Sequence, residues 1–69
     1  MNTLEIKKLL ESKPFQPFQI VLVDGTKYLI PAGDFLHVFK TGIVAYDGED
    51  GTHWLNVNLI TRVEFPIAA

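Results

Sequence analysis

A proline-bounded hairpin near the N-terminus constrains the fold of this 69-residue chain more than any other feature. Pro14 and Pro17 each remove a backbone donor and disfavour the helical conformation in the residue before them. Residues 18–23 are apolar and rich in β-branched side chains, which is typical of a strand buried on both faces. Asp24-Gly25 follows, and we expect a type I′ turn there, which needs a positive φ at both positions. The pattern predicts a strand, a tight turn and a second strand.

The residues before the prolines predict a short amphipathic helix over residues 2–13. Asn2 is a favoured N-cap, and Glu5 lies where the carboxylate of a capping box reaches back to it. The apolar side chains of this helix share one face: Leu4, Ile6, Leu9 and Leu10. A helix of this length is not stable alone in water, so it must pack on the sheet or on a partner chain.

Turn-forming residues divide the rest of the chain into short segments that favour strands. We expect these strands over residues 26–30, 35–39, 43–46, 52–57 and 61–65. Pro31 ends the first of them, and Gly42 suits a left-handed turn position. The polar residues 47–51 predict a hairpin loop, and residues 58–60 predict a single tight turn.

One helix and five or six short antiparallel strands have few ways to hide an apolar face and protect the sheet edges. We therefore expect a single mainly β domain over residues 1–69, with its one helix at the N-terminus. Residues 17–66 would form a small, strongly bent antiparallel sheet, or a barrel whose open end the helix covers. In the last strand we place Val63 and Phe65 inward, and Arg62 and Glu64 toward water.

Part of this pattern resembles a family of short uncharacterised bacterial proteins that open with one helix. The shared features are the Pro-Phe-x-Pro-Phe run from Pro14 to Phe18, the Asp24-Gly25 turn, Pro31 with residues 34–36, and a terminal strand over residues 60–64. The chain departs from that family at Ala32-Gly33, where its members often have His-Pro. The resemblance covers nearly the whole chain and implies a fold but no activity.

The helix followed by residues 20–27 also resembles the first motif of the Sm-like fold, which includes the bacterial Sm-like RNA chaperone. Residues 59–63 resemble its second motif. The resemblance implies a barrel of five to six strands, in a fold whose members form rings by joining edge strands and bind RNA on basic or aromatic surfaces. Asn56-Val57-Asn58 stands where the chaperone has its Tyr-Lys-His signature, and Pro31 replaces the expected bend glycine. The resemblance therefore supports the barrel more than RNA binding.

The candidate chemistry of the chain is sparse. His37 and His53 are its only histidines, and Asp34 precedes His37 by three positions. A zinc site needs three or four ligands that converge about 2.0–2.2 Å from the metal, which two histidines on separate strands do not provide. The carboxylates of residues 47–51 lack the spacing of a calcium-binding EF-hand loop. Ser12 is the only serine, and no histidine is placed to activate it. We expect no catalytic residue, no metal and no cofactor, and thus no enzyme.

Charge and composition disfavour nucleic acid and a membrane as partners. The net charge is −2, whereas nucleic-acid affinity comes mostly from Lys and Arg beside phosphates. The predicted helix contains three lysines, Lys7, Lys8 and Lys13, together with Glu5 and Glu11. We therefore expect a solvated face there rather than an anion-binding patch. No apolar run approaches the ~18 residues of a membrane span, and no secretory signal opens the chain. Together with the absence of cysteine, this predicts a cytoplasmic protein.

The apolar content of 48% is high for a short chain that has no disulfide. A barrel and one helix cover only one face of the strands, so the apolar residues of the other face need a second cover. We place five residues on this outer interaction surface: Val21, Val23, Leu36, Val38 and Trp54. Phe35 and Phe39 would then face inward.

These expectations predict a non-catalytic protein-interaction module that self-associates. A dimer is favoured over a ring, because Pro31 and Pro66 stand at strand ends where a ring needs free edges. A different protein partner and an Sm-like nucleic-acid-binding module remain the alternatives.

Overall fold

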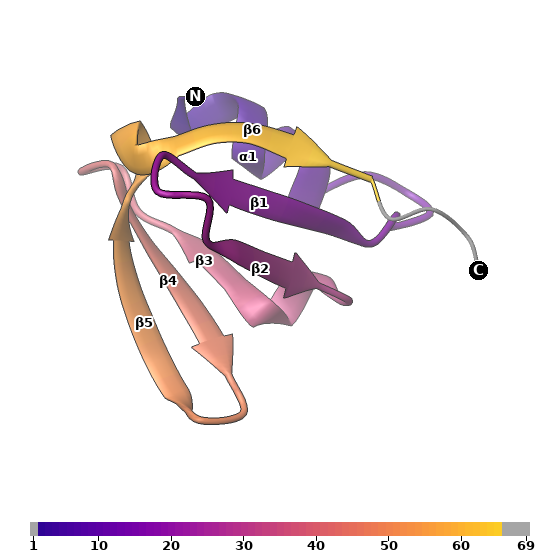
Figure 1. Ribbon diagram of the computed structural model, residues 1–69. Coiled ribbons are helices and arrows are strands. Elements are labelled where there is room, and N and C mark those ends of the chain that lie inside the picture. The colour runs from indigo at the N-terminus through magenta and orange to yellow at the C-terminus, as the bar shows by residue number, and fades with distance from the viewer. Residues whose placement is uncertain (1, 66–69) are drawn as a thin grey trace.

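The computed structural model describes residues 2–65 and confirms the mainly β class with one N-terminal helix (Figure 1). Its elements are α1 (Thr3–Leu10), β1 (Phe18–Leu22), β2 (Lys27–Ile30), the 3-10 turn η1 (Gly33–Phe35), β3 (Leu36–Val38), β4 (Ile43–Gly48), β5 (Gly51–Asn56), the 3-10 turn η2 (Val57–Leu59) and β6 (Ile60–Glu64). Each predicted strand is present, with no end shifted by more than two residues.

The strands form two separate antiparallel sheets, with the orders β2-β1-β6 and β3-β4-β5. The sheets face one another at an angle and diverge toward the β4–β5 turn (Figure 1). Within residues 2–65 they do not close into the expected barrel, because β2 does not pair with β3 and β5 does not pair with β6. The causes lie in the two connections: Pro31 and η1 interrupt the backbone after β2, and η2 turns the chain between β5 and β6.

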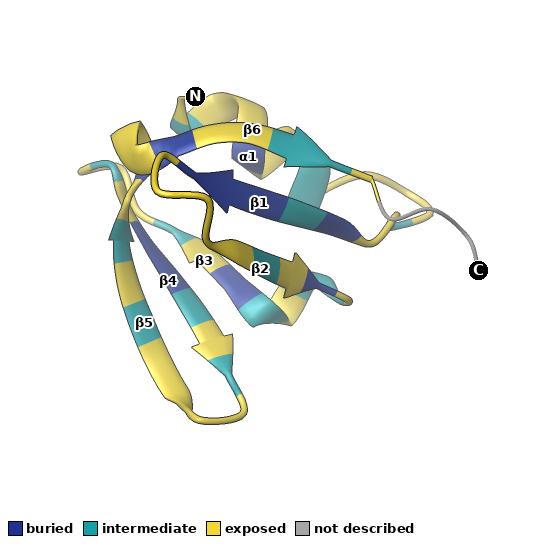
Figure 2. Ribbon diagram, viewed as in Figure 1, coloured by how far each residue is buried: buried dark blue, intermediate teal, exposed yellow. Residues whose placement is uncertain are grey.

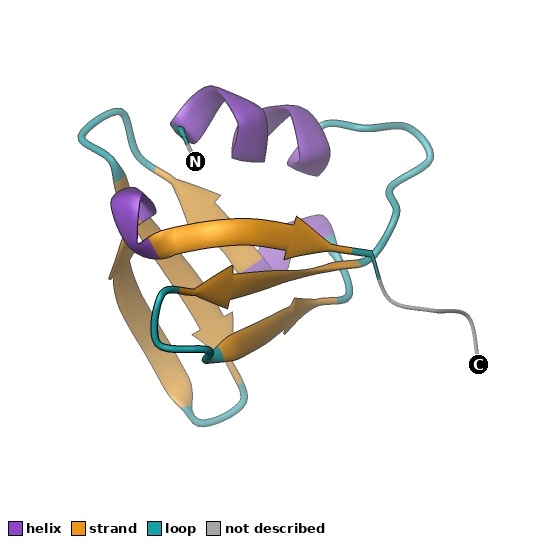
Figure 3. Cartoon of the chain, turned by 45° about the horizontal axis from the view of Figure 1, so that its top comes forward, coloured by secondary structure: helices purple, strands orange, loops and turns teal. Residues whose placement is uncertain are grey.

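One apolar core fills the space between the sheets. Phe18, Ile20 and Leu22 alternate along the inner face of β1, and Val44 lies opposite them on β4. Ile6 brings α1 into the same core with no exposed surface. Figure 2 shows buried residues along β1 and exposed ones toward the tip of the β4–β5 hairpin. In Figure 3, α1 lies across the end of the molecule remote from that tip.

The predicted capping box of α1 is confirmed. The Glu5 amide donates to Asn2 Oδ1 at 2.9 Å, and the Asn2 amide donates to Glu5 Oε1 at 3.3 Å. The helix nevertheless ends at Leu10, before the predicted end at residue 13. Past that point the Ser12 hydroxyl donates to the Lys8 carbonyl at 3.0 Å, and Pro14 disfavours a helical conformation for its neighbour.

The β1–β2 hairpin is present, but its predicted type I′ turn is wrong. Gly25 has a φ of +90°, whereas no non-glycine residue of the described chain has a positive φ. The Gly25 amide donates to the Leu22 carbonyl at 2.9 Å, and the Leu22 amide donates to the Thr26 carbonyl at 2.8 Å. This is a three-residue loop that ends in a glycine bulge. Asp24 contributes through its side chain, because its Oδ1 accepts from the Thr26 amide at 2.9 Å.

The two faces of β3 are the reverse of those predicted. Leu36 is only 2% exposed and Val38 packs against the core, whereas His37 is exposed and Phe39 is 46% exposed. The polar residue in this otherwise apolar run marks the solvent side, since burying an imidazole without a partner is costly. Phe35 packs against the core from η1 rather than from the strand. Leu36 therefore does not belong to an outer surface, and Val38 is half-buried.

Val21 also differs from its predicted place, because it is 2% exposed. In the strand register it lies directly between Lys27 of β2 and Arg62 of β6, so the three residues share one face. Glu64 binds Lys27 Nζ at 3.3 Å and Arg62 Nε at 3.1 Å. The aliphatic parts of these two basic side chains thus cover Val21.

The last strand agrees with its predicted faces at Val63, which packs against the core, and at Arg62, which is exposed. Phe65 is 53% exposed, so its predicted inward position is wrong. β6 ends at Glu64, and the alternation therefore does not extend to Phe65.

Candidate interaction surface

Three apolar side chains gather on the solvent side of the β3-β4-β5 sheet: Phe39, Ile43 and Trp54. We call them the aromatic face. His37, Ala45 and Trp54 lie in one row across the three strands, so their side chains share this side of the sheet. Phe39 and Ile43 adjoin that row, where the Phe39 amide donates to the Ile43 carbonyl at 2.9 Å.

Ala45 lets the two aromatic rings of this face meet. It lies on the central strand and is 4% exposed, although no other sheet covers its side. The rings of Phe39 and Trp54 stack with their centroids 6.2 Å apart and their planes 30° apart. Trp54 comes from β5 and Phe39 directly follows β3, so they lie on either side of β4, and the small methyl group of Ala45 leaves room for them to approach.

The aromatic face is open to solvent in this single chain. Trp54, in the middle of β5, is 67% exposed. Ile43, at the start of β4, is 42% exposed. Ile43, Trp54, Leu55 and Asn56 also line a depression of ≈ 370 Å³ beside β5. Contiguous apolar surface of this kind marks a contact with a partner more often than it marks a solvated surface.

β5 adds an unpaired sheet edge to the aromatic face. Among the described strands it pairs only with β4, so the backbone groups on its other side are available to another strand. Trp54 lies on this edge strand itself. The edge and the face together offer both backbone hydrogen bonds and apolar contact to a partner.

A groove between α1 and β3 borders the aromatic face at Phe39. It measures ≈ 370 Å³ and has Leu10, Leu36 and Val38 among its apolar residues and Lys7, Glu11 and His37 among its polar ones. A hollow of ≈ 230 Å³ continues it past Leu4 and Lys40. Neither Lys7 nor Lys40 forms an ion pair with another described residue. The groove and the hollow together thus present Lys7 and Lys40 beside one acid, Glu11.

The two histidines lie on opposite sides of the β3-β4-β5 sheet. His37 is on the solvent side, whereas His53 pairs across from Tyr46 on the inner side and its Nε2 lies 3.0 Å from Asp50 Oδ1. They therefore do not converge on one metal ion. Over residues 2–65, no group of three or more histidine, cysteine, aspartate or glutamate side chains is placed to hold a metal.

The structure separates the five residues predicted for the interaction surface. Trp54 and Val23 are exposed as expected, Val38 is half-buried, and Val21 and Leu36 are buried. The aromatic face contains Phe39 and Ile43, which the sequence reasoning did not assign to it. His37 carried the missing signal, because its polarity indicates which side of β3 faces water.

Helix α1, the one helix longer than a single turn in the described part of the chain, is too short to cross a membrane. Comparison with protein-family models, with curated proteins and with solved structures gives no match. The resemblances to the short bacterial family and to the Sm-like fold therefore stay predictions.

Proposed function

We propose that this chain is a non-catalytic protein-interaction module that forms a homodimer through β5 and the aromatic face. Trp54 carries the proposal. It lies on an edge strand that pairs only with β4 among the described strands, stacks on Phe39 and leaves 67% of its surface in contact with water. Each Å² of apolar area removed from water stabilises by about 25 cal/mol, and tryptophan is among the residues that dominate protein interfaces.

A dimer can cover the aromatic face and pair the free side of β5 with the same strand of a second copy, so no other sheet edge is needed. Two β5 strands related by a two-fold axis can pair antiparallel, which makes the contact self-complementary and joins two three-stranded sheets. A ring would instead need β5 of one copy to pair with a different edge of the next. The β6 edge strand carries Arg62 and the half-buried Glu64. Glu64 already forms ion pairs with both Arg62 and Lys27. This charged edge favours the dimer over the ring.

Light scattering coupled to size-exclusion chromatography tests the dimer at micromolar concentration. We expect a mass near twice that of the 7.8 kDa chain, and a monomer for Trp54→Thr, which keeps a β-branched residue in the strand. Leu29→Thr is the matched control, because Leu29 is an exposed apolar residue on the other sheet and should leave the dimer intact. A wild-type monomer that persists on concentrating overturns the proposal.

An Sm-like module that binds single-stranded nucleic acid is the second candidate. Stacked aromatic rings beside basic side chains bind such strands, and Lys7 and Lys40 line the hollow next to Phe39. In this proposal β2 and β3 correspond to the long bent strand of the Sm-like fold, divided at Pro31. The net charge of −2 and Glu11 in the adjoining groove favour the first candidate.

A further inference from the structure

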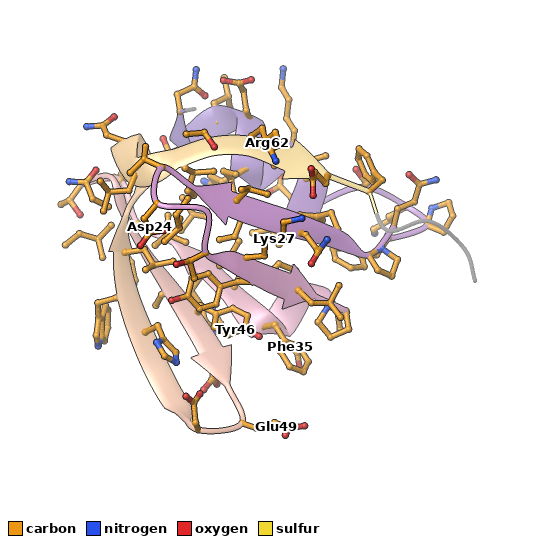
Figure 4. All side chains as sticks on the ribbon, in the orientation of Figure 1. Asp24, Lys27, Phe35, Tyr46, Glu49 and Arg62 are labelled. Carbon is orange, nitrogen blue, oxygen red and sulfur yellow. The ribbon has the colours of Figure 1, made fainter. Side chains whose placement is uncertain are left out.

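A second open surface lies at the end of the molecule remote from α1. The β4–β5 hairpin projects past β2, so the inner side of its tip has no sheet opposite it (Figures 1 and 3). A cleft of ≈ 460 Å³ occupies this place. Phe35 and Tyr46 line it between the sheets, Leu29 and Pro31 line it on the β2 side, and Glu49 and Asp50 line it at the hairpin loop. In Figure 4, Glu49 lies at the tip of the hairpin, and Phe35 and Tyr46 lie nearer the sheets.

Neighbouring rings hold Tyr46 in place in this cleft. Its ring centroid lies 4.8 Å from that of Tyr28 and 5.9 Å from that of His53, and Tyr28 and His53 are 5.5 Å apart. The Tyr46 ring packs against Gly48, where a side chain would clash with it: a Cβ at Gly48 would lie 2.8 Å from Tyr46 Cε2. The cleft therefore has an ordered aromatic ring at its base, whose face carries partial negative charge.

The hairpin places carboxylates beside these rings without balancing bases. Glu49 and Asp50 line the cleft, whereas Asp47 alternates with Tyr46 and lies on the outer side of the hairpin. Residues 41–61 contain no Lys or Arg. Glu49 forms no ion pair with any residue in the described range. The hydrogen bond between His53 Nε2 and Asp50 Oδ1 at 3.0 Å lowers the pKa of Asp50 below its ordinary value.

We propose that this cleft binds an organic cation, the guanidinium or ammonium group of an Arg or Lys side chain on a basic peptide. Aromatic faces attract a cation, and the attraction is strongest where carboxylates lie next to them. An anion would meet only like charge there. A bare metal ion would lack ligands, since no group of three ligating side chains is present over residues 2–65. The cleft lies on the inner side of the hairpin, whereas the aromatic face lies on its outer side, so the two sites are independent.

Titration of the full chain by two-dimensional amide NMR tests this site with three probes of matched size at low ionic strength. The probes are N-acetyl-arginine amide, N-acetyl-lysine amide and N-acetyl-citrulline amide, the last being a neutral analogue of arginine. We expect saturable shifts at Tyr46, Gly48 and Glu49 with both cations at concentrations up to about 10 mM, and none with citrulline. Equal binding of citrulline, or no saturation by either cation, overturns the proposal. An Arg-containing pentapeptide that binds more tightly than the amide identifies a peptide as the source of the cation; equal affinity identifies a small free amine.

Variants separate the carboxylates from the rings. Changing Glu49→Gln and Asp50→Asn together should weaken cation binding about fivefold, and Glu11→Gln on the far end of the molecule should leave it unchanged. Tyr46→Phe keeps the ring face and should keep binding, whereas Tyr46→Leu should lose it. A thermal melt of each variant confirms that it folds. Unchanged affinity in the double variant overturns the proposal, and Trp54→Thr, which tests the dimer, should bind the cation normally.

Discussion

Two glycines set the shape of the hairpin loops at single residues. Gly25 has a φ of +90° and Gly42 a φ of +92°. In each loop the glycine amide donates to the carbonyl three residues earlier, to Leu22 at 2.9 Å and to Phe39 at 3.0 Å. Both hairpins thus use the same loop, and each needs a residue without a side chain at the bulge.

Replacing Gly25 by alanine should lower the free energy of unfolding by about 1 kcal/mol or more. The added Cβ would meet no atom within 4 Å, so the loss comes from the positive φ alone. Urea denaturation measures it. Gly33→Ala is the control, because Gly33 has no positive φ and a Cβ there would have its nearest neighbour at 3.6 Å. Coincident urea midpoints for Gly25→Ala and the wild type would contradict the loop assignment.

At the scale of elements, one carboxylate joins the outer strands of the β2-β1-β6 sheet. Glu64 of β6 binds Lys27 of β2, and the central strand β1 lies between them with Val21 on the same face. Figure 4 shows Lys27 and Arg62 on this side of the sheet. Lys27 and Arg62 flank Val21 on this face, and Glu64 binds both of them. Val21 is therefore not part of an open interaction surface.

This cluster predicts a dependence of stability on pH. Hydrogen bonds from Arg62 and then from Lys27 lower the pKa of Glu64 below its ordinary value of 4.5. Because the folded state holds the lower pKa, the stabilisation is present above pH 4.5 and is lost as the pH falls through the folded-state pKa.

Urea midpoints measured between pH 7 and pH 3 should therefore fall less steeply for Glu64→Gln than for the wild type. Glu49→Gln is the control, since Glu49 forms no ion pair with the described residues and should follow the wild type. Parallel curves for Glu64→Gln and the wild type would show that the cluster contributes nothing to folding.

The β4–β5 hairpin is the element that carries both proposed sites. Its outer side contributes Ile43 and Trp54 to the aromatic face, and its inner side contributes Tyr46 and the loop carboxylates to the cleft. Strand alternation separates the two sites onto opposite sides of one hairpin. The hairpin can do this because it extends past the sheet that faces it (Figure 1).

Across the whole molecule, acidic residues gather at the end remote from α1, whereas α1 carries both signs of charge, with Glu5 on the same helix as its lysines. Lys7 and Lys8 lie on α1, whereas Asp47, Glu49 and Asp50 lie at the β4–β5 hairpin (Figure 1). The excess of acids over bases gives a net charge of −2. An extended phosphate backbone would therefore find two lysines beside Phe39 and few further cations.

We expect no salt-sensitive binding of poly-U or poly-A RNA at physiological ionic strength, because few phosphates could be neutralised. Fluorescence anisotropy with labelled RNA, measured at several salt concentrations, checks this. If RNA binding is detected, the double variant Lys7→Gln and Lys40→Gln is measured beside the wild type. Sub-micromolar binding that weakens steeply with salt and is lost in that variant would favour the nucleic-acid candidate over the dimer.

Features that depend on neighbouring residues were predictable from the sequence. The Asn2–Glu5 capping box, the β1–β2 hairpin and the strands each rest on residues a few positions apart. Of the residues predicted for the interaction surface, only Trp54 lies on the aromatic face; Val23 is exposed but lies in the β1–β2 loop. Phe39 was predicted to face inward because a large aromatic residue favours a core. It lies on the same side of the sheet as His37, and that side faces water.

The sequence by itself determined that this chain is a mainly β protein with one capped helix, because propensities and turns act over short distances. The tertiary structure decided which faces are open. Val21 is covered because the register sets it between Lys27 and Arg62, and Trp54 stays exposed because β5 has no neighbour on one side in the described chain. The pairing of Val21 with Arg62 joins residues 41 positions apart, and the open side of β5 depends on which strands pair in the folded chain, so no local pattern specifies either outcome.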